Sequence, residues 1–218
     1  MRILRFYWQS AKHLNYRGYV YIWANLLWIA LSLLVITAPA AWAGLSVLAH
    51  RSHTKRQVTL DDFWDGFKQY FWIASLNGVI TFLIFVVNLS NLVNYTTNGF
   101  IGTMIVLVWV TALLLWSAIQ LYLWSTYEEL KEPSLWLAYR NAFVMVMRNM
   151  IFTTFVLVGV VLTLLLSIIL PPLIILLTGS MLAILGTGGA LNCLRQAGFH
   201  NPEHHNPIEQ PHDSNHSR

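Results

Sequence analysis

Two groups of polar residues in this chain could do chemistry. Asp61, Asp62 and Asp65 fall within about one helical turn of one another, a spacing that suggests an acid/base or metal site. We favour structural roles, because Asp61 and Asp62 sit where the dipole of a new helix attracts anions and Asp65 faces solvent. A loose histidine cluster near the C-terminus could bind a transition metal weakly, although such tails are usually only solvated. Its members are His200, His204, His205, His212 and His216.

The sequence offers no recognisable catalytic arrangement. No Ser/His/Asp or Cys/His pattern stands out, and the single cysteine, Cys193, excludes an internal disulfide and a multi-cysteine zinc site. The glycine-rich run Gly186-Thr187-Gly188-Gly189 lacks the Lys-Ser or Lys-Thr that follows a phosphate-binding loop. We therefore expect a protein that is not an enzyme and has no cofactor and no metal site.

Uncharged polar residues recur along one apolar segment. Asn77, Thr81, Asn88 and Asn91 fall near one face of the expected helix 72–93 and could line a polar path for a small molecule. The favoured alternative is hydrogen bonding across helices, at about 0.6 to 2 kcal/mol for each bond. No ionisable residue lies inside an apolar segment, which argues against a proton-coupled carrier.

Composition places the helices that carry these residues in a bilayer. The chain has 218 residues, of which 56% are hydrophobic and 10% charged, and charged side chains are missing from 18–50, 69–127 and 149–194. A crossing helix needs ~20 apolar residues. We predict five crossings in an all-α, polytopic membrane helix bundle with short interfacial amphipathic helices. The expected crossings are 19–38, 72–93, 101–124, 151–170 and 173–194.

Three regions follow from this pattern. Residues 1–18 are predicted to form a basic interfacial segment, or a frayed terminus that orients the first crossing; 19–198 form the transmembrane domain; and 199–218 form a disordered tail. The first crossing ends near Pro39, after which 40–49 either extends a kinked helix or turns back as a re-entrant piece. Pro171-Pro172 predicts a tight final hairpin.

Two further features concern packing and the membrane interface. A stripe of small residues on the last crossing, Gly179, Ala183, Gly186 and Ala190, predicts close helix packing. Thr59 and Asp62 predict a helix start, and the rings that follow predict an interfacial anchor on the cytoplasmic face, with binding to a partner protein as the alternative. These rings belong to Phe63, Trp64, Phe67, Tyr70 and Phe71.

The Lys and Arg residues lie mostly in two connections and at the start of the tail, which favours a cytoplasmic C-terminus. The same distribution, at the edges of apolar segments, argues against nucleic-acid binding. The expected partners are the lipid bilayer and a membrane protein, either a transporter subunit or a second copy.

Several segments resemble one known family in their order and spacing: Ala24 to Trp28, the Pro39-Ala40-Ala41 break, Asp62 to Phe71, and Ala138 to Phe143. The chain resembles, over about residues 15–195, the YesL-like family of bacterial integral membrane proteins, also called the domain-of-unknown-function 624 family. Relatives more often carry Asn where Tyr70 stands. The resemblance implies a five-helix protein of the bacterial inner membrane with unassigned activity, with some relatives encoded near sugar-uptake systems. We expect an accessory or scaffold protein, with a small-molecule carrier as the alternative.

Overall fold

The computed structural model describes residues 18–54, 58–94 and 99–196, all from the expected transmembrane domain. The predicted basic N-terminal segment and histidine-containing tail lie outside these residues, apart from Gly18. The described elements are Gly18–Ser32, α2 (Ala38–Thr54), α3 (Leu60–Asn94), α4 (Phe100–Glu128), α5 (Leu135–Arg148), α6 (Met150–Ile169), α7 (Pro171–Leu173), the π-helix η1 (Ile174–Thr178) and α8 (Gly179–Gln196). The all-α fold class is confirmed.

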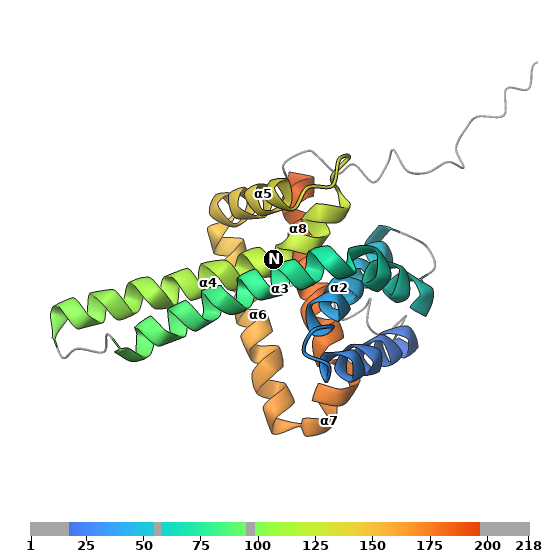
Figure 1. Ribbon diagram of the computed structural model, residues 1–218, viewed down its shortest axis with the longest axis horizontal. Helices are drawn as coiled ribbons and strands as arrows, with labels where there is room; N and C mark the ends of the chain where they lie inside the picture. Colours follow the sequence, from blue (N-terminus) through green and yellow to red (C-terminus); the bar gives the residue numbers. More distant parts are fainter. Residues whose placement is uncertain (1–17, 55–57, 95–98, 197–218) are drawn as a thin grey trace, which may run out of the picture.

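Within the described residues, four stretches are long and apolar enough to cross a membrane: α3, α4, α6, and the run from α7 to the end of α8. The short aromatic helix expected before the second crossing is not separate, because α3 continues through it for 35 residues. At 1.5 Å per residue α3 is about 52 Å long, well beyond the ~30 Å hydrocarbon core. The α3–α4 hairpin projects from the rest of the molecule (Figure 1).

The expected first crossing differs from its prediction. Its helix ends at Ser32, earlier than the predicted Ala38, and is about 22 Å long over its described residues. The chain then turns back, and α2 runs alongside this helix. The Tyr21 hydroxyl donates to Ser52 at 2.6 Å, and the Trp28 and Trp42 rings lie 6.4 Å apart. These contacts make an antiparallel pair of short helices.

The turn between these two helices is apolar. Its side chains are exposed in the isolated chain: Leu33, Leu34, Val35 and Ile36. The Thr37 hydroxyl donates to the carbonyl oxygens of Leu31 and Leu34, so part of the turn's backbone is satisfied internally.

Helix α2 packs tightly against α3. A Cβ atom on Gly44 would lie 2.8 Å from the Phe63 carbonyl oxygen, so glycine is needed where the backbones meet. Helix α3 begins as the sequence predicts, since the Thr59 N–H donates to the Asp62 carboxylate at 3.1 Å. Helix α8 shares buried clusters with the Gly18–Ser32 helix and α2 on one side and with α4, α5 and α6 on the other. It therefore joins the two halves of the fold.

The predicted final hairpin is confirmed. Helix α6 ends at Ile169, and the next helical residues begin at Pro171. Proline lacks a backbone N–H, and it fits the first positions of a helix because N–H groups there have no partner within the helix. The π-helix η1 follows, and the chain returns through α8 beside α6 (Figure 1).

Candidate functional site: polar side chains between α3, α4 and α5

A closed group of hydrogen bonds joins three helices. The Asn77 amide on α3 donates to the Gln120 side-chain oxygen on α4 at 3.1 Å. The Gln120 amide donates to Thr81 and to the Tyr139 hydroxyl of α5, each at 2.9 Å, and that hydroxyl donates to the Asn77 oxygen. These four side chains therefore hydrogen-bond to one another.

Tyr139 completes this group from outside the spanning helices. Its ring stacks on Trp116 of α4 with centroids 5.4 Å apart. Burial raises the pKa of Tyr139, so its hydroxyl stays protonated and can donate to Asn77. The arrangement is therefore uncharged at neutral pH and holds three helices at fixed positions.

Sequence reasoning identified Asn77 and Thr81 but missed Gln120 and Tyr139. Gln120 is the single amide side chain in the apolar run 105–124, which is a usable signal for an interhelical hydrogen bond. Tyr139 gives no such signal, because it lies in a polar connection between crossings, where a tyrosine does not indicate a hydrogen bond to a spanning helix.

The other two residues of the predicted polar face do not join this group. Asn88 donates to the Ile84 carbonyl oxygen and Asn91 to that of Val87, both four residues back on α3 at 2.8 Å. The four side chains therefore do not form a continuous polar path among the described residues.

The small-residue stripe of α8 lies at two different helix contacts. A Cβ atom on Gly179 would meet Trp28 and Asn25, and Ala183 is buried with Tyr21 and Ala24. Farther along, a Cβ atom on Gly186 would lie 2.7 Å from the Leu121 carbonyl oxygen of α4. Ala190 is buried in the cluster that contains Tyr122. One stripe thus serves the first helix and α4.

Asn25 holds the π-helix against the first helix. Its amide donates to the carbonyl oxygens of Ile174 at 3.1 Å and Ile175 at 2.6 Å, and its own oxygen accepts the Ser180 N–H at 3.2 Å. A π-helix interrupts the regular i to i+4 hydrogen bonds of the backbone. The fully buried Asn25 side chain provides hydrogen bonds to the two carbonyl oxygens and the N–H group named above.

The predicted aromatic anchor is divided between core and surface. Phe63 is 0% exposed and Tyr70 6%, so these two rings contact protein and are not available to lipid headgroups. The reason is the close approach of α2, which covers this face of α3. Trp64, Phe67 and Phe71 are half-buried. For these three rings the interfacial anchor stays a prediction.

The predicted aspartates separate in the same region. Asp61 is exposed, whereas Asp62 and Asp65 bind Arg51 of α2 at 2.9 and 3.2 Å. Partial burial lowers the pKa of Arg51, but these hydrogen bonds outweigh it and raise the pKa above its usual value. Among the described residues no cluster of side chains suits a metal ion.

The fold also brings together a serine, a histidine and a glutamate that the sequence did not reveal. His50 Nδ1 lies 3.1 Å from Ser125 Oγ, and His50 Nε2 lies 3.2 Å from Glu129 Oε1. Ser125 is 1% exposed, which leaves a substrate no access to its hydroxyl. We interpret the contacts as a link between α2 and the end of α4.

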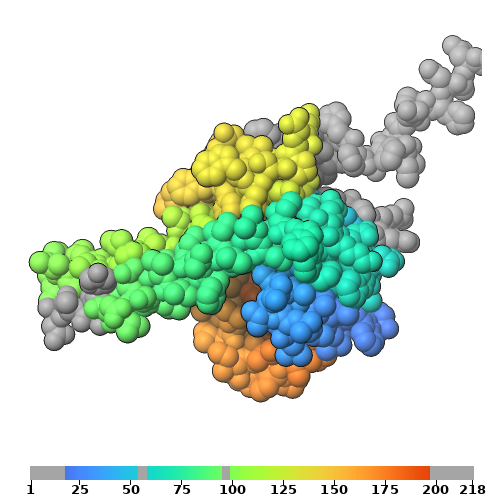
Figure 2. All heavy atoms as spheres, in the orientation of Figure 1, coloured from blue at the N-terminus to red at the C-terminus, as the bar shows by residue number. Residues whose placement is uncertain are grey.

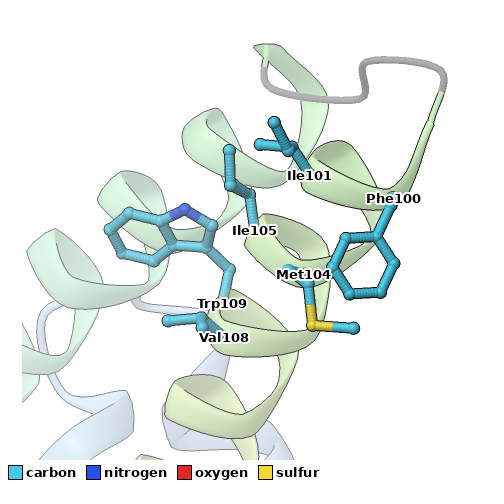
Figure 3. Close-up of a pocket in the computed structure, with 6 residues that line it drawn as sticks. All are labelled: Phe100, Ile101, Met104, Ile105, Val108 and Trp109. Atoms are coloured by element: carbon cyan, nitrogen blue, oxygen red, sulfur yellow. The ribbon is translucent and has the colours of Figure 1, made fainter.

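A shallow groove of about 350 Å³ lies near the start of α4, lined by Phe100, Ile101, Met104, Ile105, Val108 and Trp109 (Figure 3). All six residues come from one helix, and none has a charged side chain. A groove of this kind suits an acyl chain or an apolar side chain of another helix.

These features define a polytopic, all-helical membrane protein in which Asn77, Thr81, Gln120 and Tyr139 hydrogen-bond to one another between three helices. Residues 21–92 match the family described as "Protein of unknown function, DUF624", which confirms the resemblance over that part of the chain. No curated protein and no solved structure matches the chain.

Proposed function

We propose that this chain is a non-enzymatic accessory or scaffold protein of the bacterial cell membrane, with a cytoplasmic C-terminus, that binds another membrane protein through the outer part of the α3–α4 hairpin. The observation that carries the proposal is the projection of this hairpin away from the other helices (Figures 1 and 2). The link to a solute-uptake system such as one for sugars rests on the resemblance alone.

The outer hairpin supports this proposal through its side chains. Large apolar residues are exposed on both helices, including Phe82, Leu83, Val86, Phe100 and Ile101. Asn88 is 8% exposed, and its side-chain oxygen lacks a hydrogen-bond partner among the described residues. That oxygen is buried within the hairpin, so the contact offered to another helix is van der Waals packing of the exposed apolar side chains.

A small-molecule carrier is the second candidate. The polar group of Asn77, Thr81, Gln120 and Tyr139 lies between three helices, where a polar substrate could displace its internal hydrogen bonds. We rank this function lower because opening that site would break several hydrogen bonds at once.

Photocrosslinking in cells tests the accessory function. A photoreactive amino acid at Phe82, which is 68% exposed, should give a crosslink to a discrete protein, whereas one at Ile151 of α6, which is 78% exposed, should give none. The isolated chain in proteoliposomes should show no solute flux. Lipid adducts alone at both positions, or robust flux by the isolated chain, would overturn the proposal.

A further inference from the structure

Helix α5 presents two unlike faces. The buried face carries the small side chains Ala138, Ala142 and Val146, which allow close contact with α4 and α8. The opposite face is exposed and mostly apolar. It consists of Trp136, Arg140, Phe143, Val144, Met147 and Arg148, spaced mostly at three and four residues along the helix.

The position of α5 next to the end of α6 indicates what surrounds its exposed face. Asn149 links Arg148 directly to α6, and α5 lies across the end of α6 in Figure 1. The apolar stretch of α6 begins at Met150, two residues after α5 ends, so a spanning α6 places the end of α5 next to the boundary of the hydrocarbon core. A helix that lies across a spanning helix at this depth is placed in the headgroup region.

The charge on α5 has one sign. Its 14 residues include Arg140 and Arg148 and no acidic residue. Both arginines are exposed, and neither forms an ion pair within the described part of the chain. The end of α8, with Arg195 in its last turn, contacts α5 and adds a further cation to this side of the molecule.

We propose that the exposed face of α5 binds anionic phospholipid headgroups, with Arg140 and Arg148 on the phosphates and Trp136, Phe143 and Met147 among the upper acyl chains. The charge favours an anionic lipid over a zwitterionic one, and a long apolar stem lets arginine reach a phosphate from within the interface. This surface is separate from the α3–α4 hairpin, so the inference does not depend on the proposed function.

Local lipid quenching tests this proposal in the full chain. A fluorophore is attached at Phe143→Cys in a Cys193→Ala background, and the protein is reconstituted in mixed phosphatidylglycerol and phosphatidylcholine bilayers. Brominated acyl chains are placed on one lipid and then on the other. The ratio of the two quenching constants gives the local enrichment of phosphatidylglycerol.

We expect enrichment of phosphatidylglycerol that falls about fivefold when Arg140→Gln is added, with a similar loss for Arg148→Gln. Arg140→Lys should keep most of it. Lys68→Gln, which removes the same charge from the exposed surface of α3, is the matched control and should leave the ratio unchanged.

Three results would overturn the inference. The first is equal quenching by both lipids around the unchanged arginines, and the second is an equal loss in Lys68→Gln. The third is a label at position 143 that water-soluble quenchers reach and brominated lipids do not, because this face would then be open to a soluble protein partner.

Discussion

Replacing Asn25 by alanine is the sharpest test of how the two halves of the fold are joined. The side chain is fully buried and makes three hydrogen bonds to residues about 150 positions away in the sequence. Asn25→Ala removes all three and leaves two carbonyl groups and one N–H group of the last crossing without these partners. Asn25→Asp removes the two donors and keeps the acceptor.

The expected loss follows from the number of bonds. Hydrogen bonds between helices in a membrane contribute about 0.6 to 2 kcal/mol each, so the loss of three bonds should lower the free energy of unfolding by about 2 to 6 kcal/mol. Gly179 leaves little room for the first helix to shift toward α8, because even a Cβ atom at this position would lie 2.7 Å from the Trp28 ring and 2.8 Å from the Asn25 side-chain oxygen. We therefore expect little compensation by movement of the helices.

The assay is reversible unfolding by sodium dodecyl sulfate in mixed micelles, followed by circular dichroism. Asn91→Ala is the matched control, since the Asn91 amide donates to a carbonyl oxygen of its own helix and should change the free energy by less than about 0.5 kcal/mol. If both Asn25 variants unfold within about 0.5 kcal/mol of the parent protein, Asn25 does not hold the π-helix and the reasoning is wrong.

Three further predictions concern stability measured in the same way. Gly186→Ala should destabilise by about 1 to 3 kcal/mol, because its Cβ would collide with a backbone oxygen of α4, whereas Gly18→Ala has free space around it and should not. Tyr139→Phe should cost about 1 to 2 kcal/mol through lost hydrogen bonds while the ring stays in place, and no change would mean that the polar group is not structural. Arg51→Gln should cost about 1 to 2 kcal/mol, and a double-mutant cycle with Asp62→Asn should show coupling; additive losses would contradict the ion pair.

Local patterns predicted the helices and several of their ends. Charge-free apolar stretches located the long helices, Pro171-Pro172 located the final hairpin, and Thr59 with Asp62 located the start of α3. Each of these signals acts within a few residues of the chain. The sequence therefore contains them in readable form.

The contacts that fix the helices relative to one another were not readable in this way. No proline or glycine lies next to Ser32, where the first helix ends earlier than predicted. The packing of α2 against that helix depends on contacts between distant residues, such as Tyr21 with Ser52. Gln120 and His50 gain their partners from other helices. The type of a side chain does not indicate which distant residue it will contact in the fold. For that reason the sequence predicts only part of the candidate site.

The apolar turn between the first helix and α2 has a consequence for how the chain enters the membrane. If Leu33 to Ile36 stay within the lipid, the first two helices enter and leave on one side, and no loop is translocated there. The segments that must pass to the far side are then 95–99 and 170–172, neither of which contains Asp, Glu, Lys or Arg. With that topology, neither of these two segments carries a charged side chain through the hydrocarbon core during insertion.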